Sequence, residues 1–240
     1  MIHLAKRVTK LVTGLATALL IAATLAPPTT AAAEEPLIAR GNEPSFIITI
    51  GEDEVVLQMP LDGITFRSSN VTRSTVDGHP RIEVSAGGNT LQVTIEQRLC
   101  ADSMTGMPFP VAVRADFNGR RLDGCGGSTF TAIEGGWRVL ALEGKPLPDG
   151  VIATIAFEAP DRVSGKTGCN RYFGAFRLDA ESLAIGPLGA TRMICPKDEM
   201  AAEKLFLDLA ARVTRATPGE NGRMKLMAGD DEAMLLDRVD

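Results

Sequence analysis

Two short segments constrain the fold of this chain more than any other part of it: residues 164–174, SGKTGCNRYFG, and residues 191–195, TRMIC. Together they hold small residues, two cysteines and two arginines, whereas the flanking chain has the patterns of strands and one helix. We therefore predict that the first segment is a turn that organises the fold and that the second is tethered to it. Neither segment contains a complete catalytic set, so the pair indicates architecture rather than activity.

The N-terminus has the pattern of a secretory signal peptide over residues 1–33. Three basic residues within the first ten precede an uncharged run at 11–26, and a small-residue site follows at 31–33. The alternative is a transmembrane anchor, but the apolar run is shorter than the roughly 20 residues that span a bilayer. We therefore expect cleavage after Ala33, a periplasmic or secreted location, and no stable membrane anchor.

The first half of the mature chain shows short β-rich runs separated by turn residues. The runs are residues 45–50, 54–58, 63–67, 81–85, 91–97 and 110–117. Asp77-Gly78 and Gly88-Asn89 are placed to close tight hairpins, because these residue types tolerate turn dihedral angles. Strands at this spacing, without a long helical pattern, predict a small antiparallel barrel or sandwich.

The second half follows Gly135-Gly136, which we interpret as a flexible joint. Its candidate strands are residues 137–144, 151–157, 175–178, 182–185, 224–228 and 233–237. One helix is predicted to start at Pro196, to carry Arg212 and Arg215 in its last turn, and to end at Pro218-Gly219. Helical spacing places one apolar face on it, formed by Met200, Ala202, Leu205, Phe206, Leu209 and Val213.

These patterns predict one fold class: mainly β with one helix (α+β), arranged as two small antiparallel β-rich domains. The second domain is expected to be a curved sheet packed on the single helix, because the apolar face of that helix needs a sheet to cover it.

Residues 38–127 resemble an uncharacterised bacterial periplasmic domain. The segments that carry the resemblance are ARGNEPSF, CADSMTGMPFPVAV and LDGCGG. Members of that family usually begin with a GNEPFW-like stretch, and here Ser45-Phe46 replaces the Phe-Trp pair. The resemblance implies no activity. For Asn42 and Glu43 we favour a turn that caps the sheet over contact with a ligand.

Residues 136–239 resemble the META domain, or HslJ, family. Six anchors occur in order: Trp137 with Leu140, the SGKTGCNRYFG segment, IGPL at 185–188, TRMIC, Glu203 with the following Leu-Phe pair, and an apolar last strand. The resemblance implies a compact α+β domain associated with heat shock, envelope stress, motility or drug tolerance, and it implies no enzymatic activity.

Four cysteines in an exported protein indicate two disulfides, and three pairings are possible. The division into two domains selects among them, because only Cys100–Cys125 with Cys169–Cys195 keeps each bridge within one domain. We therefore predict these two bridges.

The sequence contains no set of residues that points to catalysis, a metal or a cofactor. The mature chain has one histidine, His79, which we place in an exposed turn, so a His-based triad is not expected. The cysteines lack the close spacing of a zinc site, and residues 164–168 lack the first glycine of a phosphate-binding loop. The acidic composition argues against nucleic-acid binding.

We therefore predict a non-enzymatic exported envelope protein that serves as a stress-related binding or interaction module. Its partner is expected to be an envelope protein or a small ligand, and the protein is expected to be a monomer. The alternative is an inhibitor of a cell-wall hydrolase such as lysozyme, which rests on analogy of fold and location. An enzyme that uses dispersed carboxylates is a third, less favoured possibility.

A candidate anion or partner patch consists of Asn170, Arg171, Thr191 and Arg192, which the bridge between Cys169 and Cys195 would bring together. Arginine presents a planar fork that suits carboxylate or phosphate. The competing interpretation, which we favour, is structural: Asn170 satisfies backbone groups of the turn, and an arginine pairs with an acidic residue such as Glu203.

Overall fold

The structure is a computed structural model that describes residues 35–239 of the chain. The predicted signal peptide lies outside the described residues and stays a prediction. Within residues 35–239, no helix is both long enough and apolar enough to cross a membrane.

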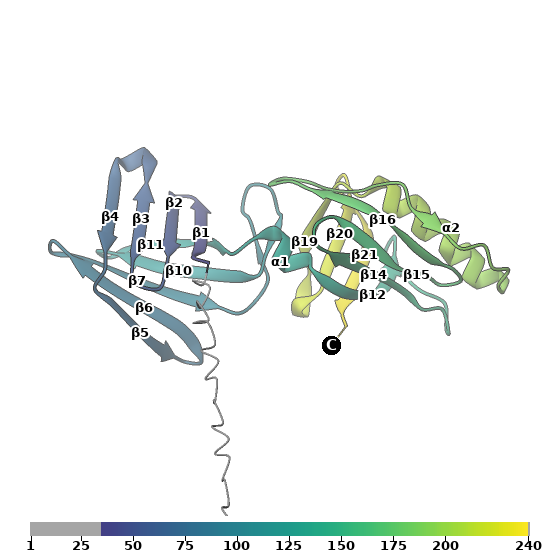
Figure 1. Ribbon diagram of the computed structural model, residues 1–240, viewed down its shortest axis with the longest axis horizontal. Helices are drawn as coiled ribbons and strands as arrows, with labels where there is room; N and C mark the ends of the chain where they lie inside the picture. Colours follow the sequence, from purple (N-terminus) through teal and green to yellow (C-terminus); the bar gives the residue numbers. More distant parts are fainter. Residues whose placement is uncertain (1–34, 240) are drawn as a thin grey trace, which may run out of the picture. The chain divides into compact units, whose positions relative to one another are not determined.

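The first half forms a nine-stranded antiparallel sheet with the strand order β4-β3-β2-β1-β11-β10-β7-β6-β5 (Figure 1). Its strands are β1 (Leu37–Asn42), β2 (Ser45–Ile50), β3 (Val55–Met59), β4 (Ile64–Ser68), β5 (Val71–Val76), β6 (His79–Ala86), β7 (Asn89–Glu96), β10 (Val111–Phe117) and β11 (Arg120–Gly126). A short 3-10 helix, η1 (Pro60–Asp62), joins β3 to β4, and β8 (Cys100–Ala101) pairs with β9 (Pro108–Phe109) in a separate two-stranded sheet. All six predicted strands of this half are present, and β1, β5, β8, β9 and β11 are additional.

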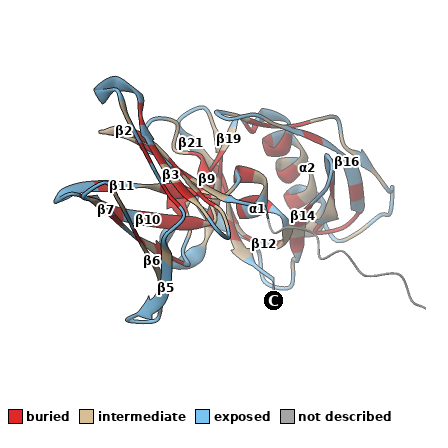
Figure 2. Cartoon of the chain, turned by 60° about the vertical axis from the view of Figure 1, so that its left-hand side comes forward, coloured by how far each residue is buried: buried red, intermediate tan, exposed pale blue. Residues whose placement is uncertain are grey.

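Successive side chains of a strand point to opposite faces, so every second side chain, usually an apolar one, lies on the inner face of the sheet. Ile48, Leu57, Leu91, Val93 and Leu122 are among the core residues that are fully or almost fully buried. Figure 2 shows buried segments in red along strands such as β3 and β10. The curved sheet therefore encloses its own hydrophobic core.

Two hairpin turns show how local chemistry sets the strand register. Asp77 and Gly78 both have positive φ, 51° and 81°, and they close the β5–β6 hairpin as predicted. The next turn uses Gly87 and Gly88, at 56° and 79°, so it lies one residue earlier than the predicted Gly88-Asn89. His79 begins β6 and is half-buried, which corrects its predicted place in an exposed turn.

The GNEPSF segment forms the tight turn between β1 and β2. Phe46, at the position where the resembled family has Trp, is 1% exposed and packs against the backbone of two glycines. A Cβ at Gly41 would lie 2.2 Å from its ring, and one at Gly124 would lie 2.9 Å from it. The aromatic side chain at this position is therefore a core residue.

The second half forms a sheet with the order β17-β16-β15-β14-β12-β21-β20-β19, with β13 beside β12 and β18 beside β16. Its strands are β12 (Gly135–Leu142), β13 (Lys145–Pro146), β14 (Ala153–Glu158), β15 (Arg162–Thr167), β16 (Arg171–Leu178), β17 (Leu183–Ile185), β18 (Gly189–Ala190), β19 (Arg215–Pro218), β20 (Met224–Ala228) and β21 (Asp231–Arg238). The helices are α1 (Thr129–Ile133), α2 (Lys197–Arg212) and the 3-10 turn η2 (Glu220–Gly222). Residues 164–174 are thus parts of β15 and β16 with a tight connection, rather than one long turn.

Helix α2 packs on this sheet and is the long helix that the sequence predicts (Figure 1). Ala202, Phe206 and Leu209 of the predicted apolar face are buried, but Met200 is 45% exposed. The helix ends at Arg212, so the prediction that it continues through Arg215 to Pro218 is wrong. Those residues form β19, because pairing with β20 satisfies their backbone groups in the sheet.

The chain between the two large sheets is ordered by short-range contacts. Ser128 caps α1, accepting a hydrogen bond from the Thr131 N–H at 3.1 Å. The Trp137 indole N–H donates to the carbonyl of Ile133 at 2.7 Å in the core. The two predicted joint residues, Gly135-Gly136, belong to β12 and pair with β14, so they are not a flexible joint.

The predicted fold class is confirmed: the protein is mainly β, with two curved antiparallel sheets and one long helix against the second. Each sheet has its own hydrophobic core, one formed by residues of the first half and the other centred on residues after 133. The predicted domain limits, 38–127 and 136–239, stay a prediction.

Candidate binding surface

Both predicted disulfides are present in the structure. Cys100 and Cys125 have α-carbons 5.6 Å apart, and those of Cys169 and Cys195 are 5.8 Å apart. The second bridge joins the β15–β16 connection to the segment that precedes α2. It therefore brings residues 164–174 and 191–195 together, as the tether was expected to do.

Asn170 is the hub of this junction, and it is 2% exposed. Its Oδ1 accepts hydrogen bonds from the Thr191 hydroxyl at 2.7 Å and from the Met193 N–H at 2.8 Å. Its Nδ2 donates to Glu203 Oε1 at 3.1 Å. Thr191 also accepts the Arg171 N–H at 3.2 Å. Asn170 and the Thr191 hydroxyl are thus engaged within the protein, as the structural interpretation expects for Asn170.

Glu203, on α2, fixes the same turn from the helix side. Its Oε2 accepts the Thr167 hydroxyl at 2.6 Å and the Asn170 N–H at 3.0 Å, in addition to the bond from the Asn170 amide. The carboxylate thus satisfies buried donors at the connection between β15 and β16. Its partners are Asn170 and Thr167, rather than the arginine that the sequence suggested.

The two arginines of the predicted patch remain available at the surface. Arg171 and Arg192 are exposed, and no carboxylate of residues 35–239 forms an ion pair with either. The neighbouring Arg162 and Arg177, in contrast, pair with Glu158 and Asp179. A third exposed cation, Lys166, lies directly opposite Arg171 in the β15–β16 register.

Large apolar side chains are exposed on the same segments. Phe173, two residues after Arg171 on the outer face of β16, is 67% exposed. Met193 and Ile194, beside Arg192, are 56% and 95% exposed. We call the six residues together the basic-apolar surface: Lys166, Arg171, Phe173, Arg192, Met193 and Ile194. Of these six residues, the sequence predicted only Arg171 and Arg192. Lys166 was missed because its position opposite Arg171 depends on the strand register, which the sequence pattern did not define.

The junction also holds a group of three potential metal ligands and a buried phenol. Cys169, Cys195 and Glu199 lie within 4.8 Å of one another, the spacing of a metal site. However, the two sulfur atoms are bonded to each other, so neither is a thiolate that could ligate a metal. Burial raises the pKa of the Tyr172 phenol well above its usual range, so this neighbouring group stays protonated at neutral pH.

Comparison with protein families agrees with the prediction for the second half. The family model of the META domain matches residues 129–240. A protein from Burkholderia xenovorans, solved by NMR, is 24% identical over 45% of this chain and 85% of its own, with a TM-score of 0.40. No curated protein matches the chain. The match to the family model confirms the predicted resemblance: residues 129–240 have the sequence pattern of a META domain.

Proposed function

We propose that this protein is a non-enzymatic envelope protein that acts under stress by binding an acidic partner protein through the basic-apolar surface. The observation that carries the proposal is the group of three exposed cations, Lys166, Arg171 and Arg192, that have no carboxylate partner within the described chain. They lie on a protein whose formal net charge is −5. The META match supports a stress-related or envelope role.

Strands β15 and β16 place two of these cations side by side. Like charges directly opposite each other across two strands destabilise a sheet, so Lys166 and Arg171 carry a cost that an approaching carboxylate would relieve. Arginine, methionine and aromatic side chains, which include Phe173 and Met193 here, are enriched at interfaces between proteins. The surface therefore suits a partner that offers carboxylates around an apolar hollow able to receive Ile194.

The rigidity of the surface also favours binding. The loop that carries Arg192, Met193 and Ile194 is held by the Cys169–Cys195 bridge and by two hydrogen bonds to the Asn170 Oδ1. A preformed loop loses less conformational entropy on association than a mobile one. The two disulfides favour an oxidising compartment, in line with the proposed export.

The decisive experiment compares wild-type protein with Arg171→Ala/Arg192→Ala and with Ile194→Ser as baits in a quantitative pulldown from periplasmic extract. Each change is at an exposed side chain, so both variants are expected to fold. Arg67→Ala, which removes an exposed arginine on β4, is the matched control. A partner lost with both variants and kept with the control supports the proposal. A partner retained by both variants contradicts it.

A second readout tests the link to stress. A deletion strain is complemented with wild-type protein or with Arg171→Ala/Arg192→Ala, and growth is measured under heat and envelope stress at equal protein abundance. We expect the wild type to restore growth and the double variant to fail. Equal rescue by both would show that the two arginines are not needed for the role in the cell.

The same geometry favours a second candidate function, inhibition of a cell-wall glycoside hydrolase. Such enzymes hold a pair of carboxylates in their cleft. Arg192, next to the protruding Ile194 on a braced loop, has the charge and shape to enter one. Inhibition of lysozyme by the wild type, lost in Arg192→Ala, would favour this candidate over the general binding module.

A further inference from the structure

A second and separate cluster of arginines lies on the first sheet. A pocket of about 530 Å³ opens on the outer face of β1, β10 and β11, beneath the segment that runs from Arg98 to Ser103. Its lining includes four guanidinium groups, from Arg40, Arg98, Arg114 and Arg121. The volume is within the range of sites for small molecules.

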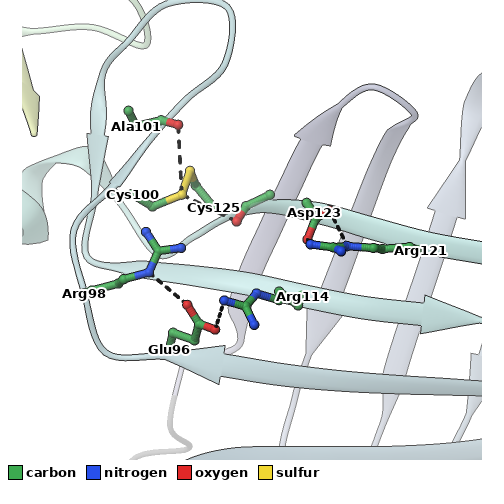
Figure 3. A network of polar contacts seen from close by, with 9 residues as sticks. Glu96, Arg98, Cys100, Ala101, Arg114, Arg121, Asp123 and Cys125 are labelled. Carbon is green, nitrogen blue, oxygen red and sulfur yellow. Dashed lines mark hydrogen bonds and ion pairs between the residues drawn. A yellow bond between two sulfur atoms is a disulfide. The ribbon is translucent and has the colours of Figure 1, made fainter.

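A buried carboxylate holds two of these arginines in place (Figure 3). Glu96, 6% exposed, forms an ion pair with the Arg98 Nε at 2.8 Å and with Arg114 at 2.6 Å. Each guanidinium has five N–H donors, so most of their donors are not used by Glu96. The hydrogen bond from Arg98 lowers the pKa of Glu96 in spite of its burial, and the charge of Arg114 adds to the effect.

The remaining charges leave the pocket positive. Arg121 pairs with Asp123 at 2.7 Å, whereas Arg40 forms no ion pair with any carboxylate in the described part of the chain. Asp102 is the other acidic group of the lining. Four guanidinium groups thus face three carboxylates, counting Glu96, on a chain with an overall negative charge.

The rim of the pocket is braced by covalent and polar contacts. The Cys100–Cys125 bridge fastens the covering segment to β11. The Asn42 amide donates to Asp102 Oδ2 at 3.0 Å and to the Ser103 hydroxyl at 2.9 Å. The other oxygen of Asp102 accepts the Thr105 N–H at 2.8 Å. This bracing gives Asn42, in the GNEPSF segment, a role in holding the shape of the pocket.

We propose that this pocket binds a small oxyanion ligand, one that carries phosphate or carboxylate groups, with Arg40 as its principal contact and Arg98 and Arg114 beside it. Guanidinium groups bind the oxygens of either group in a bidentate manner. The fixed positions of Arg98 and Arg114 lower the cost of ordering them around a ligand. The inference is independent of the proposed surface on the second half, since the two sites share no residue.

Isothermal titration calorimetry on the full mature chain tests this site with two probes, inorganic phosphate and citrate, at low ionic strength. We expect saturable binding of one ligand per chain, and the tighter probe identifies the anionic group. Arg40→Gln should weaken binding about tenfold or more, as expected for the loss of a charge-assisted hydrogen bond. Arg40→Lys, which keeps the charge but not the fork, should give a smaller loss.

The control is Arg67→Gln, which removes one positive charge from β4, a strand that does not line the pocket. It should leave the affinity within about twofold of wild type, and circular dichroism should show that every variant is folded. Absence of saturable binding for both probes would overturn the proposal. Unchanged affinity in Arg40→Gln, or an equal loss in Arg67→Gln, would also overturn it, because the binding would then be nonspecific.

Discussion

Asn170→Asp is the substitution that tests the junction most directly, because it changes one atom of a buried residue. The introduced side chain has the same size and keeps the oxygen that accepts hydrogen bonds from Thr191 and Met193. It replaces the amide donor that lies 3.1 Å from Glu203 Oε1 with a second carboxylate oxygen. An attractive contact thus becomes a repulsive one without a change in volume.

The magnitude follows from the geometry. Two unit charges at that separation repel by about 5 kcal/mol at an effective dielectric constant of about 20. Protonating the introduced carboxylate is the alternative, and from an ordinary pKa near 4 it costs about 4 kcal/mol at pH 7. This cost limits the penalty, so we expect the free energy of unfolding to fall by about 3–4 kcal/mol at pH 7. The penalty should shrink as the pH falls towards 4, because protonation then removes the repulsion at little cost.

The assay is urea denaturation followed by tryptophan fluorescence, with the disulfides oxidised. Trp137 is the single tryptophan of the chain and is 1% exposed in the core of the second half, so its emission reports on that half. Asn170→Ala is the control without added charge; it should be destabilised to a similar extent at both pH values. Combining Asn170→Asp with Glu203→Gln should recover part of the loss, since an amide then faces the new carboxylate.

Two results would refute this prediction. One is a free energy of unfolding for Asn170→Asp within about 1 kcal/mol of the wild-type value, and the other is a loss of stability that is equal at pH 7 and pH 4.5. Simple additivity of the two substitutions would also refute it, because residues in direct contact are expected to couple.

Three further predictions concern other parts of the chain. Replacing Cys169 and Cys195 by serine should lower the free energy of unfolding by about 3–4 kcal/mol for a loop of this length, measured by the tryptophan signal; no loss would show that the hydrogen bonds alone hold the junction. Since the hydrogen bond from Arg98 lowers the pKa of Glu96, that carboxylate stabilises the fold above about pH 4.5, and its contribution is lost as the pH falls through the lowered pKa. The stability difference between wild type and Glu96→Gln, followed by circular dichroism, should therefore narrow from pH 6 to pH 3. Gly41→Ala should cost about 1–3 kcal/mol or more in a calorimetric melt, because its Cβ would lie 2.2 Å from the buried Phe46 ring and 2.6 Å from the Asp123 carbonyl oxygen; wild-type stability would show that both can move aside.

Most of the secondary structure and both disulfides were predictable from the sequence, because local patterns carry that information. Alternation identifies strands such as β2 (Ser45–Ile50), which was predicted to the residue. The weakly patterned β5 (Val71–Val76) and β11 (Arg120–Gly126) were missed. β5 has almost no buried side chain, and β11 is mainly polar with glycines, so only pairing with their neighbours defines them as strands.

Helix α2 likewise has features that the local pattern predicts and features that only the tertiary structure decides. Apolar spacing located its buried face, but Arg215 belongs to β19 because sheet pairing overrides a continuing helical pattern. Met200 has the spacing of a core residue but is exposed, on the first turn of the helix.

The candidate sites depend on tertiary structure more than the fold class does. The sequence by itself determined that Asn170, Arg171, Thr191 and Arg192 would meet, since one bridge is enough to join their segments. Only the folded chain decided that Asn170 is buried against Glu203 while both arginines stay exposed. The arginine pocket of the first half is built from residues far apart in the chain, on strands whose order no local pattern encodes. Strand order and register are non-local properties, set by the packing of whole faces, and they decide which charges meet.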